Sequence, residues 1–272
     1  MTERYAVFGH PIQHSLSPLI HARFAQETQQ DLIYEAILAP LEGFQACVSQ
    51  FQLAGGKGAN ITVPFKEQAF GLCTQRSKRA ERAGAVNTFK FENGAIWGDN
   101  TDGAGLVADL TRNLDVTLSG KRILLVGAGG AARGVIGPLL EGAPAQLVIA
   151  NRTASRAHDL AAAFTQPGKS PVMGCGLDQA NTAFDLIINA TSASLAGELP
   201  NLSSQVFKPD ALAYDMMYGK ALTPFLQLAQ QYGARIADGL GMLVEQAGEA
   251  FYVWRGVRPN TQAVIASLRN AA

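Results

Sequence analysis

Residues 122–140, "RILLVGAGGAARGVIGPLL", constrain the fold more than any other stretch of this chain. An apolar strand enters a glycine-rich turn, and the turn opens a helix. Gly127 makes the tight turn, Gly129 lets a pyrophosphate approach the backbone, and the small Ala132 lets the helix pack closely on the strand. A strand-to-helix turn without a ligand is the alternative. Because the strand and the helix are both in place, we predict a dinucleotide site in a Rossmann-like domain.

The end of the next strand, "QLVIAN", indicates which dinucleotide is bound. An NAD site carries an acid there, which binds the adenosine ribose. This chain instead has Asn151, Arg152 and Thr153, and Arg156 follows one helical turn later. Arginine attracts the 2′-phosphate of NADP, which a carboxylate would repel. Two solvated surface arginines are the alternative, but their coincidence with the missing acid favours NADP. The predicted cofactor contacts are Gly127, Ala128, Gly129, Gly130, Ala131, Asn151, Arg152, Thr153 and Arg156.

Strands and helices alternate in two parts of the chain. Between residues 121 and 237 the segments "RILLVG", "QLVIAN", "FDLIINA" and "ALAYD" are nearly continuous apolar runs, typical of a parallel sheet covered on both faces. Residues 1–100 contain strand-like "RYAVFG", "LIYEAIL" and "GANITV", helical patterns at 17–28 and 41–54, and a hairpin at 85–99 with Asn93-Gly94 at its turn. We therefore predict a second α/β domain with a mixed sheet.

The C-terminal part is helical. Its apolar residues recur at helical spacing and form one stripe: Leu240, Leu243, Val244, Ala247, Phe251 and Trp254. A second helix is expected after Pro259. The spacing leaves open whether these helices extend the nucleotide-binding domain or return to the first domain.

Composition excludes several classes of function. The 272 residues are 47% hydrophobic and 16% charged, which supplies material for buried cores. Zero formal net charge without a basic run argues against binding to nucleic acid or to an anionic membrane. The N-terminus does not resemble a signal peptide, and no stretch approaches the ~20 apolar residues of a membrane span. Cys47, Cys73 and Cys175 fit neither a disulfide framework nor a zinc site. We expect free thiols and a cytoplasmic protein.

Polar residues gather near the expected strand ends and helix starts of the first domain. The segments "HSLSP", "GANITVPFK", "GAVNT" and "GDNTDG" contain Ser15, Ser17, Asn60, Thr62, Lys66, Asn87, Thr101 and Asp102. Each also has a structural explanation, since serine, threonine and aspartate cap helices, asparagine occurs in turns, and a lysine is often simply exposed. Together they supply hydroxyls, amides, one amine and one carboxylate, a set suited to a small polyhydroxylated acid.

These motifs carry a family resemblance. Together with "GAGGAAR", "NRTASR", "YDMMYG" and "ADGLGMLVEQA", they follow the order found in shikimate dehydrogenases, which this chain resembles over nearly its whole length. Residues 165–176 match no motif of the family, and we interpret them as a variable loop region. The resemblance implies reversible, NADP-dependent reduction of 3-dehydroshikimate to shikimate, in the biosynthesis of chorismate and the aromatic amino acids.

The resemblance also implies individual roles. Ser15 and Ser17 would hold the shikimate carboxylate, with Tyr218 assisting. Lys66 would handle the proton on the reacting oxygen, and Asp102 would orient Lys66 and the substrate hydroxyl. The ring and its hydroxyls would contact Asn60, Thr62, Asn87 and Gln246. The nicotinamide side of the cofactor would contact Met216 and Gly239, although methionine is more often a core residue.

Gln246 lies on the flank of the helical stripe, so the resemblance implies that the C-terminal helices return to the first domain. The expected fold is α/β with two α/β domains. Residues 1–101 with 239–272 would form the substrate-binding domain, with a mixed sheet. Residues 102–238 would form the NADP-binding, Rossmann-like domain. The sequence is compatible with a monomer or a homodimer.

Two other functions are open to such a chain. One is a related dehydrogenase that also accepts quinate or prefers NAD. The other is a non-catalytic NADP-binding sensor, which would not need both Lys66 and Asp102. No metal is expected, because hydride transfer requires none and prolines interrupt any helical register between His10, His14 and His21.

Overall fold

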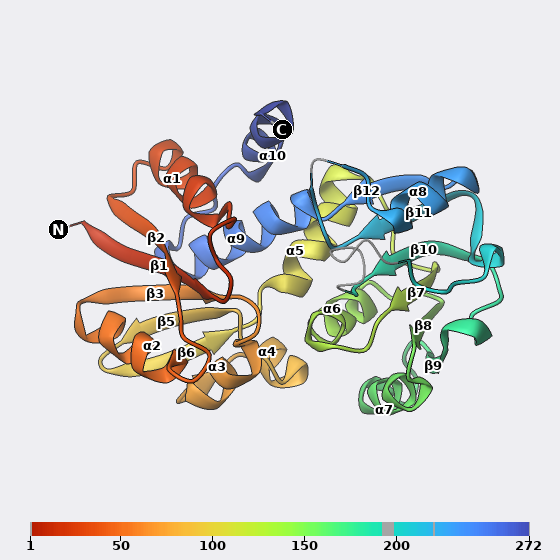
Figure 1. Ribbon diagram of the computed structural model, residues 1–272, viewed down its shortest axis with the longest axis horizontal. Helices are drawn as coiled ribbons and strands as arrows, with labels where there is room; N and C mark the ends of the chain where they lie inside the picture. The colour runs from red at the N-terminus through yellow and green to blue at the C-terminus, as the bar shows by residue number, and fades with distance from the viewer. Residues whose placement is uncertain (1, 192–198, 220, 272) are drawn as a thin grey trace. The chain divides into compact units, whose positions relative to one another are not determined.

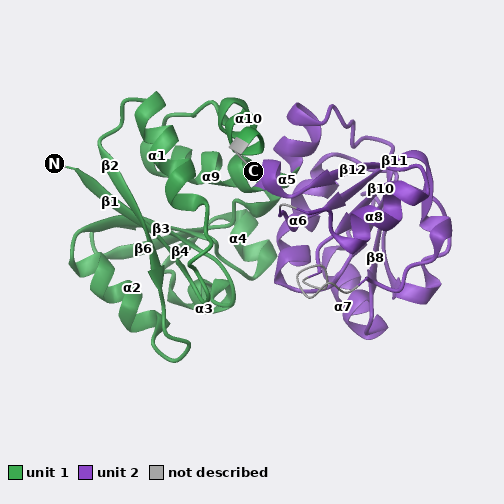
Figure 2. Cartoon of the chain, turned by 45° about the horizontal axis from the view of Figure 1, so that its top comes forward, with its two compact units in different colours: residues 1–106, 243–272 green, residues 107–242 purple. Residues whose placement is uncertain are grey.

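Two compact units make up the computed structural model, which describes residues 2–191, 199–219 and 221–271. Unit 1 comprises residues 1–106 and 243–272, and unit 2 comprises residues 107–242 (Figure 2). The chain changes unit within two helices, α5 (Asp102–Ala108) and α9 (Leu240–Arg255). Most of α9 and all of α10 (Thr261–Ala271) belong to unit 1. The C-terminal helices therefore return to the first domain, as the resemblance implied.

Unit 1 is built on a six-stranded mixed sheet with the order β2-β1-β3-β5-β6-β4. Its strands are β1 (Glu3–Gly9), β2 (Leu32–Leu38), β3 (Gly56–Ile61), β4 (Gln75–Arg76), β5 (Thr88–Glu92) and β6 (Ala95–Asp99). β1 pairs in parallel with β2 and β3, whereas β5 pairs antiparallel with β3 and β6. The β5–β6 turn has positive φ at both Asn93 and Gly94, as a tight two-residue hairpin requires. The predicted mixed sheet and its hairpin are confirmed.

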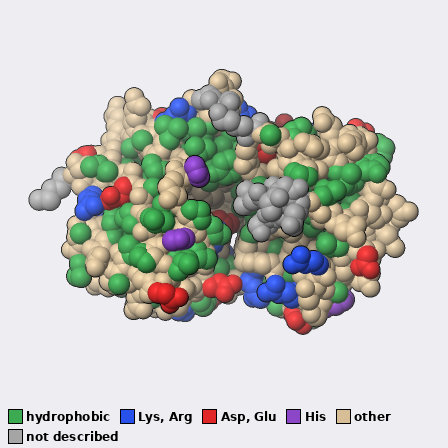
Figure 3. Space-filling view, viewed as in Figure 1, with side chains coloured by type: hydrophobic (Ala, Val, Ile, Leu, Met, Phe, Trp, Pro, Cys, Tyr) green, Lys and Arg blue, Asp and Glu red, His purple; other side chains and the backbone are tan. Residues whose placement is uncertain are grey.

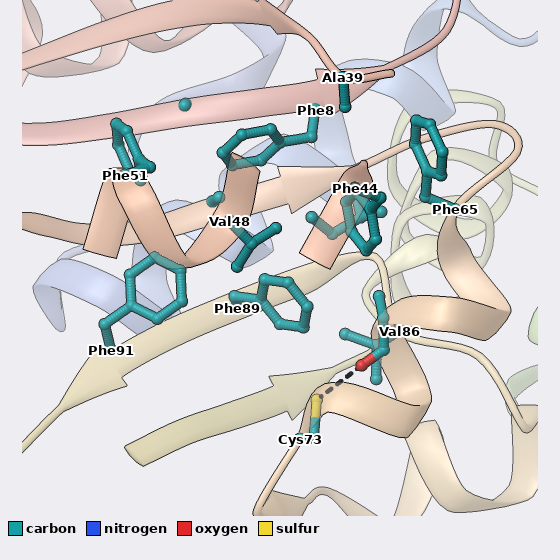
Figure 4. Packing of buried hydrophobic residues seen from close by; sticks show 14 of the residues in the cluster. Phe8, Ala39, Phe44, Val48, Phe51, Phe65, Cys73, Val86, Phe89 and Phe91 are labelled. Atoms are coloured by element: carbon teal, nitrogen blue, oxygen red, sulfur yellow. Dashed lines mark hydrogen bonds between the residues drawn. The ribbon is translucent and has the colours of Figure 1, made fainter. Parts of the chain in front are cut away.

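Helices cover both faces of this sheet (Figure 1). They are α1 (Ser17–Glu27), α2 (Phe44–Leu53), α3 (Lys66–Leu72) and α4 (Lys78–Ala83), together with α9, and α10 follows as the last helix of the chain. Successive residues of β1 point to opposite faces. Phe8 packs with Phe44 and Phe51 of α2 (Figure 4), whereas Tyr5 packs with Trp254 of α9. The indole of Trp254 also donates a hydrogen bond of 2.8 Å to the Phe89 carbonyl of β5, which ties the C-terminal helix to the sheet.

Unit 2 contains a six-stranded sheet with the order β12-β11-β10-β7-β8-β9, and all of its neighbouring strands are parallel. The strands are β7 (Arg122–Val126), β8 (Gln146–Asn151), β9 (Val172–Gly176), β10 (Phe184–Asn189), β11 (Phe207–Asp215) and β12 (Arg235–Asp238). Residues 123–126 of β7 are all 0% exposed, as expected for a strand covered on both faces. Successive strands run outward on both sides of β7, so the strand order reverses there, where such sheets bind ligands at their carboxyl ends.

The helices of unit 2 are α6 (Gly130–Glu141), α7 (Ala154–Phe164) and α8 (Pro224–Gln231), with a short π-helix, η1 (Asp109–Asn113), directly after α5. Single turns of 3-10 helix, η2 (Leu177–Gln179) and η4 (Ser204–Val206), lie between strands of the described chain. Phe225, Leu226 and Ala229 of α8 belong to the buried cluster that also contains Leu124 and Val126 of β7, and α8 contacts β11 and β12. α7 packs against β8 and β9.

Three strands were not predicted. Residues 165–176 were interpreted as a loop region, but residues 172–176 form β9 at one edge of the sheet. That interpretation was wrong because "VMGCG" has two glycines and few large apolar residues, and its pairing with β8 supplies the order that its composition does not. The other two are β4, with two residues, and β12, an edge strand of four. Both are too short to show a hydrophobic period.

Charges of both signs are scattered over the face seen in Figure 3, in keeping with the zero net charge. The thiols of Cys47, Cys73 and Cys175 are free. Within the described ranges, every helix is too short or too polar to cross a lipid bilayer.

Candidate functional site

Lys66 and Asp102 form an ion pair in unit 1. Lys66 is the first residue of α3 and Asp102 is the first residue of α5, and the Lys66 Nζ lies 2.6 Å from Asp102 Oδ2. The Lys66 side chain is 24% exposed, whereas that of Asp102 is 9% exposed. The amine is therefore accessible to a bound molecule while its carboxylate partner is largely shielded. An accessible amine held by a carboxylate can exchange a proton with a substrate oxygen.

The second oxygen of Asp102 is held by an amide. Asn87, which directly precedes β5, donates from Nδ2 to Asp102 Oδ1 at 2.8 Å and to Thr101 Oγ1 at 2.9 Å. The Oε1 atom of Gln246, on α9, lies 3.4 Å from Asn87 Nδ2 and from Thr101 Oγ1. The structure thus brings together an amine, a carboxylate and two amides that are widely separated in the sequence.

Asn60, near the end of β3, joins the same network. Its Nδ2 donates to the Asn87 carbonyl at 3.2 Å and to Thr88 Oγ1 at 3.1 Å. Its Oδ1 accepts a hydrogen bond of 2.8 Å from the hydroxyl of Tyr34, on β2. The site residues expected on β3, α3, α5 and α9 therefore share one continuous set of contacts.

The two serines lie at the start of α1. The helix begins at Ser17, and the residue before it is Leu16, so Ser17 does not occupy the position of a side-chain N-cap. Ser15 Oγ accepts the backbone N–H of Ser17 at 3.3 Å. Burial raises the pKa of Tyr34 well above its ordinary value, and the nearby Ser17 side chain opposes that rise. Ser17 therefore lies close to Tyr34, whose hydroxyl donates to Asn60.

Thr62 lies one residue beyond β3. Its backbone N–H donates to the Phe8 carbonyl at 2.9 Å, and its carbonyl accepts from the Phe65 N–H at 3.0 Å. The backbone of Thr62 is thus fixed between β1 and the turn that leads into α3, and the residue is half-buried.

The glycine-rich turn of unit 2 has room for a phosphate. Gly127 has φ +113°, which side chains with a Cβ rarely adopt. A Cβ at Gly129 or Gly130 would project into open space, at least 4 Å from the atoms that the structure describes. Gly129 directly precedes α6 and has no side chain with which to cap it, so the first amides of the helix can bind an anion. These features fit the pyrophosphate of a dinucleotide. Ala128 lies in the turn, and Ala131 lies in the first turn of α6.

The end of β8 carries the arginines. β8 ends at Asn151, α7 begins at Ala154, and the Asn151 amide donates to the Thr153 carbonyl at 3.0 Å. Arg152 and Arg156 are both exposed, and neither forms an ion pair with an acid in residues 2–191, 199–219 and 221–271. Their charges are thus available to a phosphate at the carboxyl end of the sheet.

Met216 and Gly239 lie at the same sheet edge, after β11 and β12. A Cβ on Gly239 would collide with the Met216 carbonyl, and the Gly239 N–H donates to the Met217 carbonyl at 3.1 Å. Met216 is 9% exposed and packs largely in the core. Tyr218 also belongs to unit 2, with the nucleotide-binding residues, whereas the two serines belong to unit 1. Burial raises the pKa of Tyr218.

The N-terminal histidines have separate surroundings. His21 is 0% exposed and stacks on Tyr34, with the ring centroids 4.1 Å apart. Burial lowers its pKa to about 3, and the nearby Asn60 opposes this shift without the geometry of a hydrogen bond. His10 is exposed, and its Nδ1 lies 3.0 Å from the Ala39 carbonyl oxygen.

Three family models match the chain in order. They are the shikimate dehydrogenase substrate binding domain over residues 7–89, shikimate / quinate 5-dehydrogenase over residues 109–197, and the shikimate 5′-dehydrogenase C-terminal domain over residues 239–269. A shikimate dehydrogenase (NADP(+)) from Janthinobacterium sp. (strain Marseille) is 60% identical over 270 residues, which cover 99% of this chain and 98% of the relative. The chain belongs to the shikimate dehydrogenase family.

Solved structures of similar proteins agree with this membership. An Ael1 enzyme from Pseudomonas putida superposes with a TM-score of 0.93 at 51% identity, covering 98% of each chain. Shikimate 5-dehydrogenase from Thermus thermophilus, in complex with NADP(H) and shikimate, superposes with a TM-score of 0.88 at 32% identity, covering 99% of this chain and 100% of the other. The shikimate dehydrogenase fold predicted from the sequence, with one mixed and one parallel sheet, is confirmed.

Two members of the polar network were not predicted from the sequence. Tyr34 sits in an ordinary strand pattern, and nothing in "LIYEAIL" indicates that its hydroxyl reaches Asn60. Thr88 follows Asn87 in "GAVNT", so the motif contained it, but its residue type alone indicates only a good strand former. Thr101 was recognised as a helix-cap candidate, and the structure adds its contacts to Asn87 and Gln246.

Proposed function

We propose that this protein catalyses the reversible, NADP-dependent interconversion of 3-dehydroshikimate and shikimate in the biosynthesis of chorismate and the aromatic amino acids. It is an oxidoreductase that acts on a secondary alcohol. The observation that carries the proposal is the Lys66–Asp102 pair, set among amides and hydroxyls in a unit whose sequence matches a shikimate-binding domain. A sensor of NADP would not need a partly exposed amine held by a buried carboxylate.

The substrate contacts are proposed as follows. Ser15 and Ser17 bind the carboxylate, and Tyr218 assists them. The ring and its hydroxyls are bound by Asn60, Thr62, Asn87 and Gln246. Three of these four belong to the polar network around Asp102, which supports a common site. In domain terms, residues 1–101 with 239–272 bind the substrate and residues 102–238 bind the nucleotide.

The cofactor contacts are proposed at the carboxyl edge of the parallel sheet. Amides of the turn at residues 127–131 bind the pyrophosphate. Asn151, Arg152, Thr153 and Arg156 bind the adenosine end with its 2′-phosphate, while Met216 and Gly239 contact the nicotinamide. The open space at Gly129 and the two unpaired arginine side chains within the described ranges support this assignment.

Each residue of the reacting centre has a defined task in this proposal. NADPH, when bound, supplies the hydride that the carbonyl carbon of 3-dehydroshikimate receives. The carbonyl oxygen becomes a hydroxyl by taking a proton from the Lys66 ammonium, and oxidation of shikimate returns that proton to Lys66. Asp102 holds Lys66 through Oδ2 at 2.6 Å. Because Asn87 occupies its other oxygen, Asp102 cannot rotate freely away from the amine.

The absorbance of reduced nicotinamide tests the function directly. The purified protein is given shikimate or quinate, each with NADP⁺ or NAD⁺. We expect rapid reduction only with shikimate and NADP⁺. Equal rates with quinate would establish the broader substrate range suggested by the shikimate / quinate family model, and equal rates with NAD⁺ would refute the assignment of the arginines. Tight NADP binding without turnover of either acid would establish a sensor.

We infer that the reaction takes place in the cytoplasm, where free thiols such as those of Cys47, Cys73 and Cys175 remain reduced. All proposed contacts come from one chain, so a monomer or a homodimer would be competent.

A further inference from the structure

Thr88 joins two amides of the polar network. It is the first residue of β5, and its side chain is completely buried. Asn60 Nδ2 donates to its hydroxyl at 3.1 Å, and the same hydroxyl donates to Asn87 Oδ1 at 2.8 Å. A threonine hydroxyl has one hydrogen and accepts through its lone pairs. Since the Asn60 nitrogen can only donate and the Asn87 oxygen can only accept, the direction of both bonds is fixed.

The orientation of both amides follows from their backbone partners. Asn87 Oδ1 also accepts the backbone N–H of Thr101 at 2.8 Å, and a backbone N–H can only donate. Asn87 Nδ2 must therefore face the Asp102 carboxylate, where it lies 2.8 Å from Oδ1. In the same way, Asn60 Nδ2 must face the Asn87 carbonyl, which can only accept. A rotated amide at either position would place two acceptors or two donors against each other.

From this geometry we propose that Thr88 is a positioning residue, an inference that rests on the function proposed above. Its hydroxyl holds the Asn60 amide, proposed to bind the substrate ring. It also holds the Asn87 amide, which fixes the carboxylate that orients Lys66. Loss of the hydroxyl removes one hydrogen bond from each amide in a fully buried place. One N–H of Asn60 is left without an acceptor, which is costly there, and Asn87 Oδ1 keeps only its contacts with Thr101. Both amides then shift to recover hydrogen bonds, and the substrate and the reacting pair lose their alignment.

A hydroxyl that only stabilises β5 has a different signature. Its loss would lower the melting temperature and leave the kinetics of the folded enzyme unchanged. A positioning hydroxyl changes the shikimate kinetics of the folded enzyme and spares NADP binding, because the nucleotide contacts are proposed in unit 2.

Three substitutions separate these roles. Thr88→Val removes the hydroxyl and keeps the side-chain shape, and Thr88→Ser keeps the hydroxyl and removes a methyl group. Thr28→Val is the matched control, since the Thr28 hydroxyl is also hydrogen-bonded within unit 1, at 2.6 Å to the Phe24 carbonyl, but lies outside the network. The wild type is assayed first with shikimate and NADP⁺. A wild type without turnover refutes the proposed function itself.

For Thr88→Val we expect kcat/KM for shikimate to fall about tenfold, with a changed KM for shikimate and an unchanged NADP dissociation constant. Thr88→Ser and Thr28→Val should remain within about twofold of wild type. A folded Thr88→Val enzyme with wild-type shikimate kinetics overturns the positioning role alone, and so does a Thr88→Ser enzyme as impaired as Thr88→Val. If Thr88→Val does not fold, Thr88→Cys replaces it. Cys and Ser have similar size but differ in hydrogen-bonding strength, so equal rates for these two variants would also overturn the proposal.

Discussion

In the pair formed by Lys66 and Asp102, each oxygen of the carboxylate has its own hydrogen-bond partner. Lys66 Nζ lies 2.6 Å from Asp102 Oδ2, and Asn87 Nδ2 donates a hydrogen bond of 2.8 Å to Asp102 Oδ1. The carboxylate is largely buried and the amine is partly exposed. At the scale of single residues, this arrangement supports the proposal that Lys66 transfers the proton and Asp102 orients it.

Substitution of the pair tests this assignment. Lys66→Ala should lower kcat for shikimate oxidation by at least ~10²-fold, the low end for general acid–base catalysis. Shikimate binding should weaken less, because the other proposed contacts remain. Asp102→Asn should also lose most of its turnover while circular dichroism shows a folded protein that still binds NADP. Lys57→Ala, which removes an exposed lysine of β3, is the control. Near-normal turnover in Lys66→Ala would rule out the proposed chemistry.

At the scale of secondary-structure elements, the choice of nucleotide is proposed to lie in the connection between β8 and α7. β8 delivers residues 151–153 to the carboxyl edge of the parallel sheet, and the first turn of α7 adds Arg156 close by in sequence. Strand and helix thus present two positive charges where a related NAD site presents one acid.

Neutralising both arginines tests this role. Charge-assisted hydrogen bonds contribute ~1.5–3 kcal/mol each, so Arg152→Gln with Arg156→Gln should raise the KM for NADP by about a hundredfold or more. The KM for NAD should stay nearly constant, because NAD lacks the 2′-phosphate. Steady-state rates with both nucleotides at saturating shikimate provide the measurement. NADP kinetics within about twofold of wild type would show that the arginines are merely solvated.

At the scale of the whole molecule, a buried histidine links folding to pH. The pKa of His21 falls from 6.5 to about 3 on burial in the aromatic cluster of unit 1. Between these two pH values the unfolded chain binds a proton at His21 that the folded chain does not. The contribution of His21 to the free energy of unfolding is therefore fully present above about pH 6.5 and is lost as the pH falls toward 3. At 1.36 kcal/mol per pKa unit, the loss by pH 5 is about 2 kcal/mol.

His21→Phe keeps a ring against Tyr34 and removes the titrating group. The free energy of unfolding, measured with urea, should fall between pH 7 and pH 5 in the wild type. In the variant this fall should be about 2 kcal/mol smaller. His158→Gln, a change at an exposed histidine of α7, should behave as the wild type does. Equal losses in His21→Phe and wild type would mean that other groups cause the acid sensitivity.

Local patterns in the sequence predicted the elements that carry strong periodicity or turn chemistry. The strand–glycine–helix segment at residues 122–140, the Asn93-Gly94 hairpin and the apolar stripe of α9 all formed as expected, since each signal comes from residues close together in the chain. The short edge strands β9 and β12 were missed, because they are ordered by pairing with a neighbouring strand rather than by their own composition.

The sequence by itself determined which polar and charged residues are present. Its resemblance to a known family indicated which of them to propose as site residues. Only the tertiary structure decided which atoms meet. The polar network joins β2, which carries Tyr34, β3, which carries Asn60, and the start of β5, where Asn87 and Thr88 lie. Its hydrogen bonds depend on the parallel and antiparallel registers of one sheet. Gln246 joins them because α9 packs back on that sheet through Trp254. Such contacts depend on pairing over long sequence separations, which local propensity does not encode, because the packed core fixes them only when the whole unit has folded.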